Sequence, residues 1–356
     1  MFSIEYFSSL TPYIDVLKNS PLPIFIYGMG DGCAKLAGIF ERYKIPCAGI
    51  FASDEFVRDK TFLGHKIRRL ADIERQVEDF IIVLAFGAGY ASLIEKIDRI
   101  AKRHRLIVPD MPVVGDGLFT IDYLQENFGS LEAVYRLLAD SRSRLCYESL
   151  IEYRITGDIS CLKRCETSRV EAYSLLRLGT GEIYADLGAY TGDTVAEFAS
   201  AVKGKYLRIY AVEPDRRNFR KLTENTSGMP SVTAVNAAAG DFCGAVTVAK
   251  GGGRMIKKSE SGISVPQVTL DSVLGGEGCT YIKYDVEGAE MQALRGSGRT
   301  IAKYKPKLNV ALYHRVDDIF KIPLYVHSML PEHRLYIRHF PYYPAWDTNL
   351  YAVPAI

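Results

Sequence analysis

Acidic side chains flank a glycine turn in the second half of the chain. From Asp186 to Asp193 the sequence reads DLGAYTGD, and Gly188 and Gly192 lie inside it. A dinucleotide site sets bare backbone amides and a helix N-terminus against a pyrophosphate, and two carboxylates there would repel that dianion. They suit a ligand that carries an ammonium group beside its carboxylate. S-adenosylmethionine has such a methionyl end, so we predict that this turn binds it.

A further acid follows the next apolar run. Glu213 stands about 20 residues beyond the glycine turn, the spacing at which an acidic side chain accepts hydrogen bonds from ribose hydroxyls. We therefore predict that Glu213 binds the ribose of the same ligand. A structural alternative stays open, in which Asp186 and Glu213 only cap their strands and the glycines only turn the chain.

A second charged cluster lies in the segment YIKYDVEGAE, residues 281–290. Side chains alternate along a strand, so Lys283, Asp285 and Glu287 point to one side. Three charged groups at the end of a buried strand are costly unless they pair or serve a site. We predict that Asp285 and Glu287 are functional. In the alternative, Lys283 and Asp285 form a salt bridge and Glu290 is a charge at a helix N-terminus.

One histidine follows the next predicted strand, residues 308–313. His314 would reach the same edge, where an imidazole that titrates near neutral pH could take a proton from a substrate hydroxyl. His314 is the first candidate for the base and Asp285 the second, although a lone histidine is more often structural. A divalent cation held by Asp285 and Glu287 could instead lower the pKa of the hydroxyl. We assign no metal ligand.

The elements that carry these residues alternate between strand and helix. Apolar runs at 183–187 and 207–212 enclose a helical stretch at 194–201, the pattern of a doubly wound α/β domain with its ligand at the carboxyl ends of the strands. A strand at 232–238 follows, and the loop after it makes Asp241 a candidate for contact with the adenine amino group. Runs at 335–340 and 349–353 predict a final antiparallel hairpin, whose aromatic loop could line an acceptor pocket.

The N-terminal part has a strand-turn-helix pattern of its own. A strand at 24–27 leads into Gly28-Met-Gly30-Asp-Gly32, and an acid, Asp54, follows the strand at 48–51. The outline is that of a nucleotide fingerprint, but Cys33 occupies the expected third glycine position, and a lone G-x-G is weak evidence. A tight turn in a docking or oligomerisation domain is about as probable as nucleotide binding. We predict a Rossmann-like domain at 1–115, a helical connector at 116–170 and a second domain at 171–356.

Composition excludes several classes of protein. A net charge of +2 with lysine and arginine spread among acids predicts no nucleic-acid partner. No apolar stretch reaches the roughly 18 residues that span a bilayer, and the N-terminus lacks the features of a secretory signal, so we expect no membrane association. Seven scattered cysteines suggest reduced thiols in a cytoplasmic protein. A homodimer could form through the N-terminal domain.

In the order of these predicted strands, turns and charged residues, the chain resembles the FkbM family of S-adenosylmethionine-dependent methyltransferases. The resemblance covers roughly residues 186–354, about half the chain, and no single motif decides it. The motifs that carry it in order are ADLGAYTGDT, AVEPD, VNAAAGD, VTLDSV, YIKYDVEGAE, the YH at 313–314 and NLYAVP.

The resemblance implies a class I methyltransferase fold and, commonly, methylation of a hydroxyl on a sugar or a polyketide-type natural product. It implies that Asp285 and Glu287 border the reacting sulfonium. The appended N-terminal domain slightly favours a glycan or glycosyl acceptor. The predicted cofactor-binding set is Asp186, Gly188, Ala189, Gly192, Thr194, Glu213, Pro214, Ala238, Asp241 and Asp285.

The reaction expected from this resemblance is an in-line displacement, in which an acceptor oxygen attacks an activated methyl carbon held about 3 to 3.5 Å away. Two other functions stay open on the sequence alone. One is a non-catalytic protein that binds S-adenosylmethionine or a nucleotide sugar. The other is an NAD-dependent oxidoreductase that acts through residues 28–32.

Overall fold

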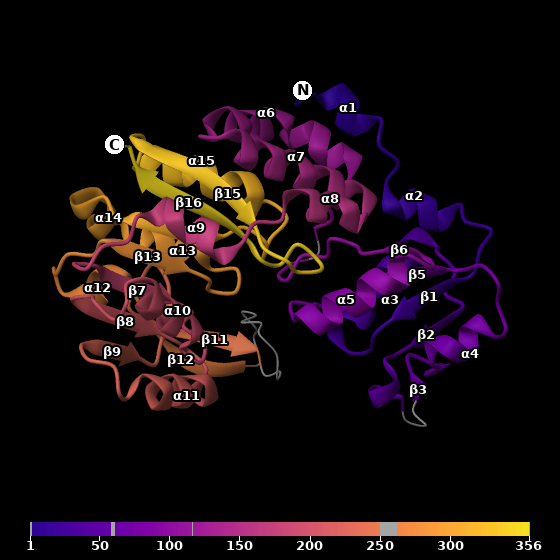
Figure 1. Cartoon of the computed structure of the whole chain (residues 1–356), viewed down its shortest axis with the longest axis horizontal. Helices are drawn as coiled ribbons and strands as arrows, with labels where there is room; N and C mark the ends of the chain where they lie inside the picture. The colour runs from indigo at the N-terminus through magenta and orange to yellow at the C-terminus, as the bar shows by residue number, and fades with distance from the viewer. Residues whose placement is uncertain (1, 58–60, 116, 250–261, 356) are drawn as a thin grey trace.

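A computed structural model of the chain describes residues 2–57, 61–115, 117–249 and 262–355 (Figure 1). Two separate sheets organise these residues. A four-stranded sheet has the order β2-β1-β5-β6, and a seven-stranded sheet has the order β15-β16-β14-β13-β7-β8-β9. Both are covered by helices, so the predicted α/β class is confirmed.

The N-terminal unit is a small parallel sheet. Its strands are β1 (Ile24–Tyr27), β2 (Gly49–Phe51), β5 (Ile81–Leu84) and β6 (Arg105–Ile107). Every residue of β1 and β5 is buried, as expected of parallel strands between helices. The other elements of this unit are α1 (Ile4–Ser8), α2 (Tyr13–Lys18), α3 (Asp31–Tyr43), β3 (Thr61–Phe62), β4 (His65–Lys66), α4 (Leu70–Glu74), α5 (Ala91–Ala101) and the single 3₁₀ turn Asp54–Phe56.

Four helices connect the two sheets in the sequence. They are α6 (Ile121–Leu137), α7 (Ser141–Thr156), α8 (Ile159–Cys165) and α9 (Arg169–Leu176). Side-chain caps begin each of them, from Thr120, Asp140, Asp158 and Ser168. Isolated bridges join this region to strand β15 of the large sheet, at Leu138–Leu335 and Glu166–His339.

The large sheet has a parallel centre and an antiparallel edge. The parallel strands are β7 (Ile183–Leu187), β8 (Arg208–Val212), β9 (Val232–Val235), β13 (Tyr281–Tyr284) and β14 (Lys307–Ala311). Strand β16 (Thr348–Pro354) runs antiparallel to β14 and to β15 (His333–His339), which confirms the predicted final hairpin.

Helices and a small accessory sheet complete this unit. The helices are α10 (Asp193–Ala201), α11 (Arg216–Thr226), α12 (Leu270–Leu274), α13 (Glu290–Arg295), α14 (Gly298–Tyr304) and α15 (Asp318–Met329). The accessory strands are β10 (Ala238–Ala239), β11 (Gly244–Ala249) and β12 (Gly262–Val268). The predicted strand at 232–238 is wrong in its extent, because β9 ends at Val235 and Ala238–Ala239 pairs with β12 instead.

The order of the large sheet fixes where a ligand can bind. The chain proceeds from β7 outward to β8 and β9, and then returns to place β13 on the other side of β7. Such a reversal opens a crevice at the carboxyl ends of the two central strands. The pairing of β13 with β7 sets Lys283 opposite Asp186, so the two predicted charged clusters lie side by side. No helix of the described residues is long and apolar enough to cross a membrane.

Candidate active site

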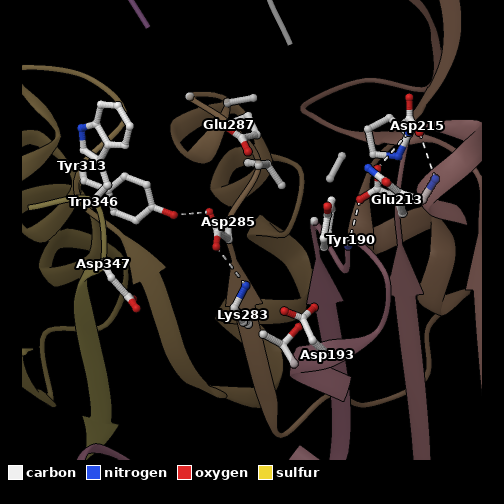
Figure 2. Close-up of a pocket in the computed structure, with 18 of the residues that line it drawn as sticks. Tyr190, Asp193, Glu213, Asp215, Lys283, Asp285, Glu287, Tyr313, Trp346 and Asp347 are labelled. Carbon is white, nitrogen blue, oxygen red and sulfur yellow. Dashed lines mark hydrogen bonds and ion pairs between the residues drawn. The ribbon is translucent and has the colours of Figure 1, made fainter. Parts of the chain in front are cut away.

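A cleft of about 1830 Å³ lies at the carboxyl ends of the central strands (Figure 2). Gly188, Glu213 and Asp285, which follow or end three neighbouring strands, all line it. The N-terminal unit also contributes to its wall, through Gly87 and Tyr90. The cleft is therefore shared by the two sheets rather than confined to one.

The glycine turn after β7 is shaped by close backbone packing. Gly188 has φ +88°, and a Cβ on it would lie 1.9 Å from the carbonyl oxygen of Asp285. Its amide donates to the carbonyl of Val212 at 2.9 Å, so the turn is tied to both neighbouring strands. Gly192, with φ +87°, precedes helix α10 as its N-cap. Only glycine meets these conditions at position 188 without displacing the backbone.

Asp186 lies beneath the cleft rather than on its wall. Its side chain is fully buried, and its Oδ2 accepts a hydrogen bond of 2.5 Å from the hydroxyl of Thr194. The Nζ of Lys283 lies 3.8 Å from its Oδ1. Burial raises the pKa of Asp186, and the charge of Lys283 partly offsets that effect. Thr194 and Lys283 do line the cleft, so Asp186 contacts two side chains of the cleft wall without lining it itself.

Glu213 lies on the cleft wall in a fixed orientation. Its two carboxylate oxygens accept the backbone amides of Tyr190 and Asp215, each at 2.9 Å (Figure 2). Burial raises the pKa of Glu213 to about 7, and these amide hydrogen bonds limit the shift. Pro214 and Ala238 line the cleft beside it. Glu213 therefore lines the cleft as a carboxylate whose orientation is fixed by two backbone amides.

Besides Asp186, three other residues of the predicted cofactor set do not line the cleft. Ala189 is buried, and Gly192 packs against Leu222. Asp241 is exposed and forms an ion pair with Arg295, with 3.2 Å between its Oδ2 and the arginine Nε. The predicted contact of Asp241 with adenine therefore does not agree with its position. Ala238 and Ala239 of the short strand β10 line the cleft, but Asp241, two residues later, does not.

Asp285 projects into the cleft from the end of β13. Its carboxylate accepts a hydrogen bond from the hydroxyl of Tyr313 at 2.8 Å and one from Lys283 at 3.3 Å (Figure 2). Burial would raise the pKa of Asp285, but Lys283, His314 and the Tyr313 hydroxyl outweigh it and hold the pKa below its usual value. Asp285 is therefore ionised and oriented at neutral pH.

His314 is enclosed by carboxylates. Only 1% of its side chain is exposed, its Nε2 lies 3.4 Å from Glu287 and 3.6 Å from Asp285, and its Nδ1 lies 2.9 Å from Glu290. Burial lowers the pKa of His314, but the surrounding carboxylates overcome that effect and raise it well above its ordinary value. His314 does not line the cleft either.

This geometry does not favour His314 as the base, because the ring does not line the cleft and its nitrogens face three carboxylates. An imidazole that already carries its second proton at neutral pH cannot accept another from a substrate hydroxyl. A sequence position at the end of a strand gave no sign of this, because Glu287 and Glu290 reach the ring from a different segment. His314 instead supplies a buried positive charge that holds Asp285 and Glu287 in place.

Glu287 is the second carboxylate on this side of the cleft. Its backbone has φ +53°, an uncommon value for a residue with a side chain. Burial raises the pKa of Glu287, and His314 reduces the shift. Between Asp285 and Glu287, Glu287 therefore has the greater affinity for a proton.

The alternative of a divalent cation held by Asp285 and Glu287 gains no support from the acidic cluster found here. Ligand atoms of Asp285, Glu290 and His314 all lie within 4.8 Å of one another. However, Glu290 Oε1 already accepts the amides of Val286 at 2.9 Å and Gly288 at 3.3 Å, so it stabilises the turn after β13. We therefore assign no metal to this cluster, the one group of possible ligands found among the residues that the structure describes.

Sequence reasoning missed several residues of the cleft wall. Tyr313 orients Asp285, and its place beside His314 at the end of a strand could have suggested it. Arg169 and Asp347 form an ion pair of 2.5 Å across the cleft wall, between segments far apart in the sequence. No local sequence pattern predicts such an ion pair. Tyr90, from the N-terminal unit, was missed for the same reason.

Comparisons with known proteins agree with this geometry. The family model of the methyltransferase FkbM domain matches residues 186–342. A methyltransferase FkbM from Methylobacillus flagellatus KT has a similar structure over 95% of this chain and 92% of its own, with a TM-score of 0.71 and 20% identity. That likeness extends through the N-terminal unit as well as the large sheet, and at this identity it shows the fold.

Other solved structures are similar over about half the chain. An rRNA methylase from Streptococcus thermophilus covers 52% of this chain and 95% of its own, with 12% identity and a TM-score of 0.36. Fibrillarin from Aeropyrum pernix, solved with natively bound S-adenosylmethionine, covers 51% and 74%, with 15% identity and a TM-score of 0.34. A search of curated proteins found no match. The family match, together with the motifs of the glycine turn and of β13, identifies residues 186–342, just under half of the chain, as similar to the methyltransferase domain of the FkbM family.

Proposed function

We propose that the protein is an S-adenosylmethionine-dependent methyltransferase that methylates a hydroxyl group of a sugar, glycan or natural-product acceptor. One observation supports this above the others. The cleft at the reversal of the sheet presents Glu213 on one side and Asp285 on the other, and the bare backbone of Gly188 lies between them. Carboxylates in these places favour a cation that carries a ribose.

The residues present fit the cofactor. Glu213 offers a carboxylate edge for two ribose hydroxyls, and Gly188 leaves room beside the backbone for a ligand chain. Thr194 and Lys283, both set by Asp186, face the cleft where the amino-acid end would lie. When bound, S-adenosylmethionine supplies a methyl group activated by its sulfonium. The protein then has only to position an acceptor and remove its proton.

The acceptor hydroxyl needs one group to orient it and one to receive its proton. Asp285 suits the first role, because Tyr313 and Lys283 fix its carboxylate and its lowered pKa keeps it ionised. Glu287 suits the second, because its raised pKa makes it the stronger base. His314, protonated beside both, stabilises the ionised form of Glu287 before the transfer.

The N-terminal glycine motif is better explained by packing than by a nucleotide. A Cβ on Gly32 would lie 2.0 Å from the carbonyl oxygen of Ala85, and one on Gly28 would lie 2.5 Å from the ring of Phe86. These contacts require glycine whether or not a ligand binds. They favour a tight structural turn at residues 28–32 over a dinucleotide-binding site. A methyltransferase is therefore favoured over an NAD-dependent oxidoreductase that acts through these residues.

Calorimetry and product analysis test this function. Isothermal titration should show binding of S-adenosylmethionine and none of NAD. With a pool of glycosyl acceptors, the protein should release S-adenosylhomocysteine. Binding of S-adenosylmethionine without turnover across hydroxyl acceptors of all three classes would indicate a non-catalytic binding protein. Binding of NAD alone would contradict the proposal outright.

A further inference from the structure

The N-terminal unit reaches the methyltransferase cleft through one loop. After β5 the chain passes through Gly87, Ala88 and Gly89 to Tyr90, which precedes helix α5. Ala88 pairs with Tyr343 of the loop between β15 and β16, through hydrogen bonds of 2.6 and 2.9 Å. Figure 1 shows this C-terminal loop extending toward the end of α5. The two units are thus joined directly beside the cleft.

Two glycines allow aromatic rings to lie on this loop. A Cβ on Gly89 would be 2.5 Å from the ring of Tyr342, and one on Gly87 would be 2.7 Å from the Tyr342 hydroxyl and 3.0 Å from the ring of Trp346. Any side chain at either position would push these rings away. The indole nitrogen of Trp346 also donates to the carbonyl of Met111, at 3.2 Å. Both aromatic residues are therefore seated on the backbone of the N-terminal unit.

Tyr90 extends this aromatic surface into the cleft. It is 77% exposed, although it is a large aromatic residue, and it lines the cleft together with Tyr342 and Trp346. Figure 2 shows Trp346 beside Tyr313, on the side where Asp285 projects. An aromatic surface formed by two units thus stands next to the carboxylates that would orient the acceptor.

The aromatic rings and carboxylates on this side of the cleft favour one class of acceptor over others. Aromatic faces pack against the C–H faces of a sugar ring, and nearby carboxylates and amides accept hydrogen bonds from its hydroxyls. Asp285, Glu287 and Asp347 all line this side of the cleft, and Arg169 is already paired with Asp347. These carboxylates would repel a phosphate at this end, whereas the hydroxyls of a neutral ring could donate hydrogen bonds to them.

Resting on the proposed function, we propose that the N-terminal unit forms one wall of the acceptor site. In this arrangement Tyr90, with Tyr342 and Trp346, stacks on a neutral glycosyl ring of the acceptor. The N-terminal unit is then an acceptor-recognition domain rather than a second nucleotide-binding domain. The methyltransferase domain alone would lack this wall.

Trp346 reports directly on this site, because it is the only tryptophan of the chain. We would titrate the full-length protein with a panel of methyl glycosides of common hexoses and N-acetylhexosamines, and follow the tryptophan fluorescence. At least one glycoside should shift the emission in a saturable way. Tyr90→Ala should weaken that affinity about fivefold or more.

Phe56→Ala is the matched control. Phe56 is 63% exposed, belongs to the same unit and does not line the cleft, so its loss should leave glycoside affinity unchanged. Calorimetry with S-adenosylmethionine is a separate measurement, and neither variant should alter it. If no glycoside changes the fluorescence, or if Tyr90→Ala binds glycosides as the wild type does, the sugar-binding wall is wrong. Failure of S-adenosylmethionine to bind would instead contradict the proposed function.

Discussion

The backbone of Gly188 lies directly against the carbonyl oxygen of Asp285, so that even one added carbon atom would come within 1.9 Å of it. The two residues follow β7 and β13, which pair side by side up to Leu187 and Tyr284. The loop that would hold the cofactor and the loop that carries the reacting carboxylates therefore cannot move independently. A substitution in the loop after β7 should therefore also alter the loop after β13.

Substitution of Gly188 tests this coupling. Gly188→Ala adds a clash and places a side chain at φ +88°, so we expect a loss of stability of about 1 to 3 kcal/mol and at least a tenfold loss of S-adenosylmethionine affinity. Gly298→Ala is the control, since a Cβ there would meet no atom within 4 Å. Thermal unfolding and calorimetry measure the two effects. Wild-type affinity in Gly188→Ala would show that the turn is not the cofactor site.

The buried charge of His314 should appear in the pH dependence of stability. Its folded-state pKa is raised, so the folded protein keeps a proton that the unfolded chain loses above about pH 6.5. The stability from this group is fully present below that pH and is lost as the pH rises toward the folded-state pKa. As the pH rises above about 6.5 toward the folded-state pKa, the free energy of unfolding should therefore fall more steeply in the wild type than in His314→Gln.

His314→Gln should also be less stable at pH 7, by about 3 to 5 kcal/mol, because the buried carboxylates lose their partner. His327→Gln, a half-buried histidine on α15, serves as the control and should keep the wild-type slope. Urea unfolding at several pH values measures both effects. Equal slopes in the wild type and His314→Gln would mean that the imidazole is neutral, and would restore it as a candidate base.

The sequence predicted the large sheet and the ends of its strands well, because an acidic residue that directly follows an apolar run is expected where a buried strand ends. Asp186, Glu213 and Asp285 were located in this way. It did not predict the extent of the strand at 232–238, which ends at Val235 because Ala238–Ala239 pairs with β12 instead, and Asp241 after it does not line the cleft. The protonation of His314 depends on Glu287 and Glu290, whose approach is a tertiary property. Contacts between the two units, such as that of Tyr90 with the cleft, produce no periodic pattern in the sequence from which they could be predicted.

Cofactor affinity should itself depend on pH through Glu213. Its pKa is raised to about 7, so the carboxylate is ionised above that pH and protonated below it. A ribose hydroxyl bonds more strongly to the charged form, by about 1 kcal/mol or roughly fivefold in affinity. S-adenosylmethionine should therefore bind more weakly at pH 6 than at pH 8. Glu213→Gln should bind weakly at both values, and an unchanged pH dependence in that variant would place the titrating group elsewhere.

The assignment of the proton acceptor can be tested by removing one charge. Glu287→Gln keeps the shape of the side chain but cannot accept the proton, so we expect the rate of S-adenosylhomocysteine formation to fall by about 10² or more, with cofactor affinity nearly unchanged. Glu332→Gln, exposed and outside the cleft, should react at the wild-type rate. In the wild type the rate should also decline on the acid side as Glu287 becomes protonated, and because burial raises its pKa, this decline should begin above the range of an ordinary glutamate. A full rate in Glu287→Gln with a large loss in Asp285→Asn would assign the proton transfer to Asp285, and the lowered pKa of that group would then set the acid limb of the profile.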